Sequence, residues 1–144
     1  MNVSSILRRK GTHVETAAAE TTLGDAARRL STSGIGSLVI LDASGDVVGV
    51  LAERDLVRAF AEHGAAALDL PARAALPGPP ATCKPDESVE KVMSLMTARR
   101  TRHVPVVASD ALVGIVSIGD LVKSRLEDLR LEVGVLRDYA RTRA

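Results

Sequence analysis

The sequence predicts a mixed α/β (α+β) fold in which two tandem β-α-β-β-α units pack as one pseudo-two-fold module, followed by a long C-terminal helix. Three observations lead to this prediction: an internal duplication, short apolar runs that alternate with helix-like segments, and an apolar stripe near the C-terminus. The chain has 144 residues, 46% of them hydrophobic. This is enough for one compact domain, or for two very small units that share a core.

The duplication covers most of the chain. The apolar run Leu38–Leu41 lies over Val104–Val107 at a shift of 104 − 38 = 66 positions. After a turn that is one residue shorter in the second copy, Gly49–Val57 lies over Gly114–Val122 at a shift of 114 − 49 = 65. Because apolar pattern, turn and terminal aspartate stay in step over so long a stretch, we interpret the two halves as copies of one unit.

In the first copy, a short strand is followed by a helix that begins at Thr22. Thr22 and Asp25 have the [ST]-x-x-[DE] spacing of a capped helix start. The apolar residues that follow fall on one helical face. They are Leu23, Ala26, Ala27 and Leu30.

Two strands and a second helix complete the first copy. The run Leu38–Leu41 is too short for a helix and predicts a buried strand. The turn residues Ser44–Asp46 lead into Val47–Leu51, which predicts a hairpin. A second helix is expected over Glu53–Glu62, ended by Gly64.

The domain organisation follows from the repeat and from a stretch rich in alanine and proline between the copies. Because proline can continue neither a helix nor a strand ladder, this stretch is predicted to be a connector. The predicted ranges are 1–66 for the first unit, 67–79 for the connector, 80–130 for the second unit and 131–144 for a helical extension. Since so small a sheet is marginal alone, the units are expected to pack together with a cleft between them.

The C-terminal stripe predicts a helix from about Ile118 to Arg141, on the order of 35 Å long. Its apolar residues recur at spacings of four and three, and charged residues occupy the other faces. The stripe could pack on the protein's own module or on a second chain, and both readings stay open at this stage. Its members are Val122, Leu126, Leu129, Val133, Leu136 and Ala140.

Composition excludes several classes of partner. With 19 basic and 18 acidic residues the net charge is only +1, which argues against binding to nucleic acid or to a membrane surface. The single cysteine excludes an internal disulfide framework. No secretory signal or membrane-spanning run is visible, so a cytoplasmic protein is expected.

The residues best placed for chemistry are Ser117 and Asp120, where a predicted strand turns into a helix. A helix start presents free backbone N–H groups and the positive end of its dipole, which attract phosphate. A serine hydroxyl can add a bond to a phosphate or sugar oxygen, and a carboxylate can accept both hydroxyls of a ribose. The same spacing also fits a simple capping box without any ligand.

The segment Gly114–Asp120 has a glycine, two aliphatic residues, a serine, two variable residues and an aspartate. This motif, closing a duplicated unit of this length, resembles the CBS domain. The tandem resembles a stand-alone Bateman module with a single pair of units. Modules of this family bind adenosine-containing ligands such as AMP, ADP, ATP, S-adenosylmethionine or NAD(H) between the units. The resemblance implies that Asp120 and Ser117 serve one cleft and Asp55 the other.

The first copy departs from this pattern at Ala52, which stands where the hydroxyl residue belongs. Alanine can neither cap a helix nor bond a phosphate, so the cleft of Ser117 and Asp120 is expected to bind more tightly. Losing one hydrogen bond costs about 0.5–1.5 kcal/mol, which leaves weak binding at the other cleft. Arg54 is either a phosphate ligand across the cleft or a solvated arginine.

The resemblance implies further ligand residues. Basic side chains before the second strand of a unit often face the phosphates, which points to Arg102 and His103, the latter when protonated. The alternative is two exposed basic residues. Adenine would be held near five further positions, among which Cys83 is expected to be a small buried apolar residue. These positions are Thr16, Leu38, Thr82, Cys83 and Val104.

The sequence therefore predicts a regulatory sensor of adenine nucleotides that alters dimer or partner contacts, with no required cofactor and no metal site. A homodimer is expected, because CBS modules commonly pair. The alternative is a ligand-independent interaction or scaffold module. No enzyme is predicted, because no metal-ligand spacing, nucleophile motif or complete phosphate loop appears.

Overall fold

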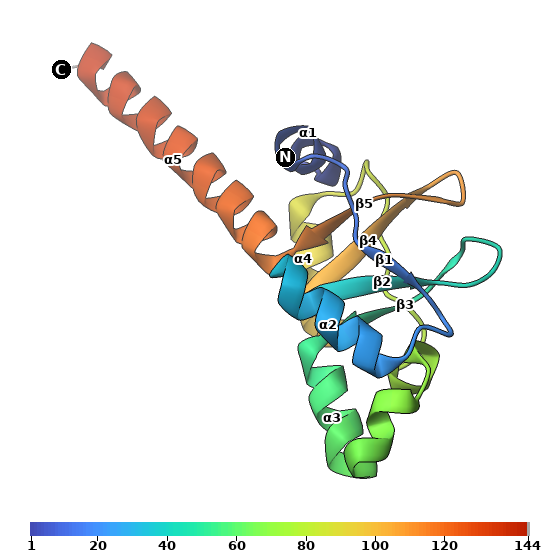
Figure 1. Cartoon of the computed structure of the whole chain (residues 1–144). Coiled ribbons are helices and arrows are strands. Elements are labelled where there is room, and N and C mark those ends of the chain that lie inside the picture. The colour runs from blue at the N-terminus through green and yellow to red at the C-terminus, as the bar shows by residue number, and fades with distance from the viewer. Residues whose placement is uncertain (144) are drawn as a thin grey trace.

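The computed structural model describes residues 1–143 and contains five α-helices, five strands and two short 3₁₀ helices (Figure 1). The helices are α1 (Val3–Lys10), α2 (Leu23–Ser33), α3 (Glu53–His63), α4 (Val89–Arg99) and α5 (Ile118–Arg143). The strands are β1 (Thr16–Ala18), β2 (Ser37–Leu41), β3 (Val47–Ala52), β4 (His103–Ala108) and β5 (Ala111–Ser117). The 3₁₀ helices are η1 (Gly64–Asp69) and η2 (Ala72–Ala75).

The duplication is confirmed by two small sheets built in the same way. In the first, β1 runs parallel to β2 and β2 runs antiparallel to β3; in the second, β4 and β5 form an antiparallel pair. The predicted first strand of the second copy is reduced to a single parallel bridge between Cys83 and Val106. Proline at position 85 and the turn around it leave that segment too short for a longer ladder.

The helix start predicted at Thr22 is present, because Thr22 accepts a hydrogen bond from the backbone N–H of Asp25 at 3.2 Å. The structure adds an equivalent cap at Ser88, which accepts a hydrogen bond from the backbone N–H of Lys91 at 3.1 Å. The predicted apolar face of α2 points into the first core, where Leu23 and Ala26 are almost fully buried. Local capping and periodicity therefore fixed these elements as expected.

Each unit has its own hydrophobic core, and each core is completed by the segment that precedes the other unit. Helix α1, which the sequence did not predict, buries Val3 and Leu7 in the second core. The connector helix η2 buries Ala72 in the first core, with Leu76 packed beside it. The matching positions are related by 72 − 3 = 69 and 76 − 7 = 69, so these leader segments form a third repeated element.

Backbone hydrogen bonds hold the two leader segments in equivalent places. The N–H of Val3 donates to the carbonyl of Glu87 at 3.0 Å, and the N–H of Ala72 donates to that of Thr21 at 2.7 Å. The predicted ranges 1–66, 67–79, 80–130 and 131–144 stay a prediction. The packing adds that residues at the start of the chain complete the core of the second unit.

Close approach of the leaders explains the motif glycines. A Cβ on Gly114 would lie 2.7 Å from Cδ2 of Leu7, and one on Gly49 would lie 2.8 Å from Cδ1 of Leu76. Both distances are well below van der Waals contact. A side chain at either position would therefore force the side chain of Leu7 or Leu76 to shift.

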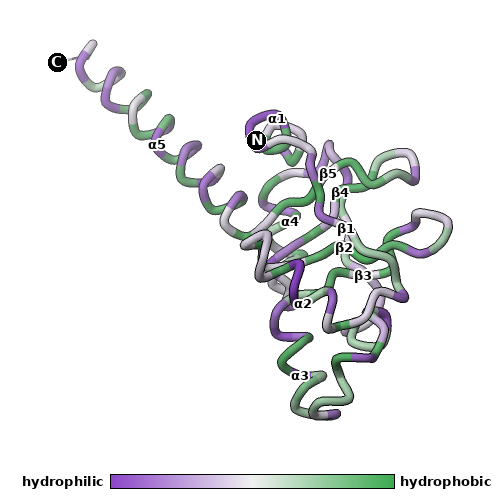
Figure 2. The backbone as a smooth tube through the Cα atoms, in the orientation of Figure 1, coloured by the Kyte–Doolittle hydropathy of each residue, from purple (hydrophilic) through white to green (hydrophobic). Residues whose placement is uncertain are grey.

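Helix α5 is confirmed and has 26 residues, about 39 Å at 1.5 Å per residue. It starts within the module, where Leu121 and Ser124 are buried, and then projects away from it (Figure 1). Apolar and hydrophilic residues alternate along the projecting part (Figure 2). The stripe residues Leu126, Leu129 and Leu136 are 49%, 41% and 67% exposed, so the reading in which the stripe packs on its own module is wrong.

Within residues 1–143, each helix is either too short or too polar to pass through a lipid bilayer.

Candidate functional site

Two clefts of equal size lie where the units meet, each about 280 Å³, near the lower end of the range for ligand pockets. The Ser117 cleft is lined by Lys10, His13, Val14, Glu15, Ile35, Gly36, Ser37, His103, Ile115 and Ser117. The Val50 cleft is lined by Val50, Pro77, Gly78, Pro79, Pro80, Ala81, Arg99, Thr101 and His103. Val50 and Ile115 are equivalent in the two copies, so the clefts are related by the internal symmetry.

The turn from β5 into α5 forms one wall of the Ser117 cleft. The N–H of Asp120 donates to the Ser117 hydroxyl at 3.2 Å, and the N–H of Ser117 donates to Oδ2 of Asp120 at 2.8 Å. This is the reciprocal capping box that the spacing allows. The capping reading is therefore confirmed, while a ligand role for the same two residues stays a prediction.

Asp120 is held as a carboxylate by its neighbours. Burial alone would raise its pKa, but a hydrogen bond from Lys10 and the Ser117 N–H outweigh that effect and lower the pKa below its ordinary value. The Lys10 ammonium lies 2.7 Å from Oδ2 of Asp120 and 3.0 Å from the carbonyl of Ile115. With 24% of its side chain exposed, Asp120 remains within reach of a solute.

Lys10 is a site residue that sequence reasoning missed. It ends helix α1 and lines both the Ser117 cleft and a smaller adjoining cavity of about 110 Å³. That cavity also has Arg9, Lys123 and Asp120 on its wall. Of these cations, Lys10 contacts the Asp120 carboxylate, whereas Arg9 donates a hydrogen bond to Glu127. The leader repeat at the 69-residue shift was the signal that could have pointed to α1.

The histidine expected to clamp phosphate sits between the clefts. His103 lines both of them, and a Cβ on Gly36 would lie 3.6 Å from its Cε1. Burial lowers the pKa of His103, and the positive charge of Lys10 lowers it further. The lowered pKa disfavours the protonated form that was expected from the sequence to face phosphate, and a ligand role for His103 stays a prediction.

Glu15 adds an anion to the Ser117 cleft. Its carboxylate accepts hydrogen bonds from His13 at 3.0 Å and from Arg29 at 3.1 Å. These bonds, that of His13 first, lower the pKa of Glu15. The wall of this cleft therefore carries a basic residue, Lys10, and an acidic one, Glu15.

Asp55, the predicted counterpart of Asp120, is in a different environment. It is 2% exposed, accepts the N–H of Ala52 at 2.8 Å and pairs with Arg58 at 3.0 Å. No hydroxyl caps this helix, as expected from Ala52. Asp55 lies on the wall of a third cavity, about 280 Å³, between α3 and the connector within the first unit, rather than in the Val50 cleft.

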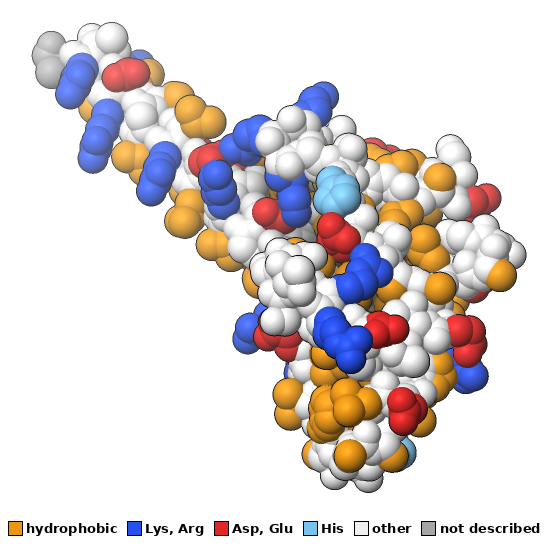
Figure 3. Space-filling model, in the orientation of Figure 1, with side chains coloured by type: hydrophobic (Ala, Val, Ile, Leu, Met, Phe, Trp, Pro, Cys, Tyr) orange, Lys and Arg blue, Asp and Glu red, His pale blue; other side chains and the backbone are white. Residues whose placement is uncertain are grey.

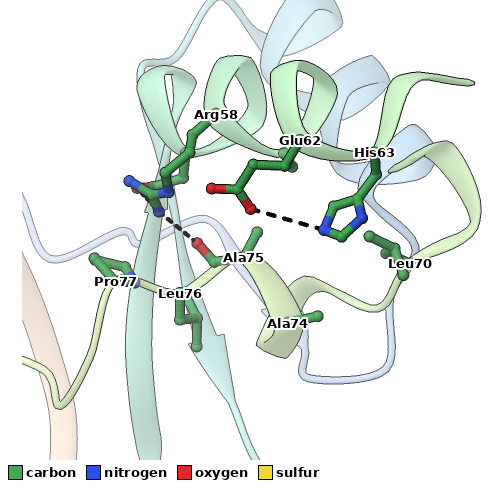
Figure 4. A pocket seen from close by; sticks show the side chains of 10 residues that line it. Arg58, Glu62, His63, Leu70, Ala74, Ala75, Leu76 and Pro77 are labelled. Atoms are coloured by element: carbon green, nitrogen blue, oxygen red, sulfur yellow. Dashed lines mark hydrogen bonds and ion pairs between the residues drawn. The ribbon is translucent and has the colours of Figure 1, made fainter. Parts of the chain in front are cut away.

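Figure 4 shows this third cavity. The side chain of Arg58 reaches across it and donates to the carbonyl of Ala75 at 3.1 Å. Glu62 and His63 face each other at 3.8 Å on the other side. Asp55 thus pairs with the arginine that links helix α3 to the connector.

Two basic residues that were predicted to bind the ligand, Arg54 and Arg102, do not line the clefts. The Arg54 guanidinium donates a hydrogen bond to the carbonyl of Arg100, across the junction between the units. Arg102 is exposed just before β4, outside the lining of either cleft. The readings of Arg54 and Arg102 as cleft cations are corrected accordingly.

The predicted adenine positions are mostly core residues. Leu38 and Val104 are fully buried and Cys83 is 2% exposed, so their side chains do not line the clefts. Burial, with a smaller effect of Glu87, raises the pKa of the Cys83 thiol to about 12, which fits the predicted inert apolar role. Thr16 pairs with Val39 in the first sheet.

Thr82 lies in a further cavity, outside both clefts. That cavity is near the hairpin turns and is lined in part by Asp46 and Asp110. Of the predicted set, the structure therefore brings together Ser117, Asp120 and His103.

Comparison with known proteins gives the class to which this geometry belongs. The model of the CBS domain matches the chain twice, at residues 3–62 and 72–127. The chain therefore belongs to the CBS domain family and carries two tandem CBS domains.

Individual relatives agree with this assignment. The chain is 31% identical over 114 residues to an uncharacterised 17.7 kDa protein of Acidianus ambivalens, covering 78% of this chain and 68% of that protein. It is 26% identical to the mitochondrial CBS domain-containing protein CBSX3 of Arabidopsis thaliana, covering 95% and 70% of the two chains.

Solved structures show the same arrangement. The CBS-domain protein ATU1752 of Agrobacterium tumefaciens superposes with a TM-score of 0.81 at 41% identity, over 86% of this chain and 92% of that one. The CBS domain pair of protein MJ0100 superposes with a TM-score of 0.75 at 27% identity, over 90% and 98%. The latter was solved in complex with 5′-methylthioadenosine and S-adenosyl-L-methionine.

Proposed function

We propose that this protein is a regulatory module that binds an adenosine-containing ligand, AMP, ADP, ATP or NAD(H), in the Ser117 cleft. The observation that carries the proposal is the carboxylate of Asp120 at a helix start, on the wall of the small cavity that shares Lys10 with that cleft. Binding there alters the contacts of a dimer or of a regulated partner. The module is not a catalyst in this proposal, and the cytoplasmic location expected from the sequence is part of it.

The carboxylate supports recognition of a ribose. Asp120 is ionised and therefore accepts hydrogen bonds at both oxygens. One oxygen already accepts from the Ser117 N–H and from Lys10. Ribose hydroxyls bind Asp120 by displacing the lysine ammonium, which then turns toward the ligand.

The surroundings of Asp120 support a phosphorylated ligand. Arg9, Lys10 and Lys123 line the small cavity next to the carboxylate. Cations on flexible side chains at a helix start favour phosphate through charge and through the helix dipole. The apolar residues Val14, Ile35 and Ile115 in the cleft offer a surface for the flat base.

Regulation requires that the ligand distinguish two arrangements of the units. The Ser117 cleft takes Glu15 and Ser37 from the first unit and Ile115 and Ser117 from the second. A ligand that contacts both walls favours the arrangement in which the walls fit it. The solved neighbour with adenosyl ligands supports this class of ligand.

The second candidate is a ligand-independent interaction module. The capping box and the Lys10 ion pair satisfy Asp120 without any ligand, which favours this alternative. The exposed stripe on α5 serves either function equally.

Titration calorimetry on the full chain tests the proposal with AMP, ATP, NADH, S-adenosylmethionine and adenosine. We expect at least one phosphorylated ligand to bind more tightly than about 1 mM, and to bind more tightly than adenosine. The control variant is Asp138→Ala, which removes an exposed carboxylate from the same helix far from the cleft. Folded protein that binds none of the five below that concentration would refute the sensor function and leave the interaction module.

A further inference from the structure

We propose that helix α5 pairs in parallel with α5 of a second copy, forming a two-stranded coiled coil that holds two modules side by side. The inference rests on the proposed function only in that it names the surface that makes its dimer contact. It follows from the position, spacing and charge of the α5 stripe.

The stripe is continuous, exposed and turned away from the module. It starts at Val122, which is 41% exposed although it lies next to buried Leu121, and continues to Ala140. At 100° per residue, buried Ser124 falls on the far side of the helix from the stripe, and buried Leu121 lies about 100° from it, on one flank. The stripe itself is therefore left uncovered by the module and is open to a second helix.

The spacing and residue types fit a coiled-coil seam. Alternating steps of four and three give the 3.5-residue period of heptad positions a and d. Leu129 and Leu136 occupy d positions and Val133 an a position. Leucine at d with a β-branched residue at a favours two parallel strands. The seam is narrower than the wide apolar face of a helix that lies in a membrane surface.

The charges beside the seam favour a second copy in parallel. One flank, the e positions, carries Lys123, Arg130 and Arg137; the other flank, the g positions, carries Arg125 and Glu132. Figure 3 shows basic side chains recurring along α5 next to apolar ones. An antiparallel pair would place the basic flank against itself and is therefore unfavourable.

In the parallel pair each basic flank faces the g flank of the other copy. Arg137 then meets Glu132 of the second copy, twice per dimer. Arg130 faces Arg125, whose charge is already paired with Glu90 at 3.3 Å within the chain. The parallel pair thus gains ion pairs between Arg137 and Glu132. One heptad earlier, Arg130 faces an arginine whose charge is already paired within its own chain.

The seam also begins at the candidate ligand site. Val122 follows Asp120 by two residues on the same helix, so the capping box and the dimer contact share one rigid element. A ligand that displaces Lys10 from Asp120 acts directly on the base of the dimer helix.

Light scattering of the full chain without ligand tests the inference, because each chain weighs 15.1 kDa and monomer and dimer are well separated. Leu136→Glu should convert the dimer to monomer. The matched control is Leu131→Glu, since Leu131 and Leu136 are 66% and 67% exposed but lie on opposite sides of the helix. A wild-type monomer, or equal effects of the two variants, overturns the seam. Circular dichroism confirms that each variant is folded.

Charge exchange tests the identity and direction of the partner. Glu132→Arg and Arg137→Glu should each weaken the dimer, about tenfold in dissociation constant. Mixing these two variants should restore the dimer, because both ion pairs re-form in the mixed pair. Failure of the mixture to recover overturns the parallel homotypic pairing. An acidic partner helix is then indicated if the chain is monomeric, and a membrane if it sediments with anionic vesicles.

Ligand calorimetry on the same variants separates this inference from the proposed function. A monomeric Leu136→Glu variant that still binds nucleotide supports both the cleft and the seam. A stable wild-type dimer that binds no nucleotide supports the seam and refutes the sensor. A wild-type monomer that binds nucleotide refutes the seam and supports the sensor.

Discussion

The two clefts of this module have the same size and the same place in their repeats, yet they differ in almost every chemical property. The Ser117 cleft has Lys10, His13 and Glu15 on its wall, whereas the Val50 cleft has the uncharged residues Pro79 and Ala81 where His13 and Glu15 stand in the first copy. The backbone of a duplicated unit provides the cavity, but the side chains at equivalent positions decide what the cavity can bind.

The two motif aspartates show the same divergence. Asp120 is partly exposed and balanced by Lys10, whereas Asp55 is buried and balanced by Arg58. The first carboxylate is partly exposed, whereas the second pairs with Arg58, which donates to the carbonyl of Ala75 in the connector. One motif residue thus has a candidate binding role in one copy and a structural role in the other.

The largest expected effect separates the two aspartates by ligand binding. Asp120→Ala should weaken nucleotide affinity about 10- to 100-fold, because hydrogen bonds to a charged group contribute about 1.5–3 kcal/mol. Asp55→Ala should change the affinity less than threefold, since Asp55 is 2% exposed and lines neither the Ser117 cleft nor the small cavity that adjoins it. Titration calorimetry measures both, and equal losses would contradict the ranking of the clefts.

The same pair should show the opposite order in stability. Asp55→Ala leaves the N–H of Ala52 without its buried acceptor and Arg58 without its partner, and should lower the free energy of unfolding by about 1–3 kcal/mol. Asp120→Ala should cost less, because its side chain is more exposed and its partners can reach water. Urea denaturation checks this; a larger loss at Asp120 would show that the burial difference does not govern stability.

Helix caps provide the next comparison, at equivalent positions. Ser117→Ala should lower the free energy of unfolding by about 1 kcal/mol, and Ala52→Ser should raise it by a similar amount, because a hydroxyl can then accept the free N–H at the start of α3. Thermal unfolding of the two variants gives the sign. A destabilising Ala52→Ser would mean that the first unit has no room for the cap.

The smallest expected effect is the pH dependence of the Ser117 cleft. The folded pKa of His103 and that of Asp120 are both lowered, so each group contributes stability above its ordinary pKa that is lost as pH falls through its folded value. For His103 the loss starts below its ordinary value of 6.5, and for Asp120 below 3.8.

Two variants test which residue causes each part of the dependence of stability on pH. His103→Gln should flatten the free energy of unfolding between about pH 6.5 and 5, by less than about 1 kcal/mol because the ring is only partly buried. Lys10→Met should flatten the part below about pH 4 in the same way. Urea denaturation at several pH values provides the measurement, and unchanged profiles would mean that these groups do not set the acid response.

Much of the fold follows from local signals. The cap at Thr22, the apolar face of α2 and the strand Leu38–Leu41 depend on residues a few positions apart, and the structure has them as predicted. Helix α1 was missed because eight residues are too short to form a stable helix without tertiary packing. Its match to the connector is displaced from the main repeat by three residues, since 69 − 66 = 3.

The site was only partly predictable for a related reason. Ser117, Asp120 and His103 lie close together because the ladder pairs His103 with Ser117, and that pairing follows from the predicted hairpin. Lys10 and Asp120 are 110 positions apart in the chain, and no local sequence pattern predicts their contact. Arg54 and Arg102 are basic in sequence terms, but their direction depends on how the units meet.

By itself, the sequence determined the duplicated unit, the capped helix starts, the missing cap at Ala52 and the length of the C-terminal helix. These features depend on periodicity and on hydrogen bonds between near neighbours. Only the tertiary structure decided that each leader completes the opposite core, that Asp55 is buried while Asp120 is open, and that Lys10 stands beside Asp120. Burial and ion pairing arise between segments far apart in the chain, so they appear only when the two units pack.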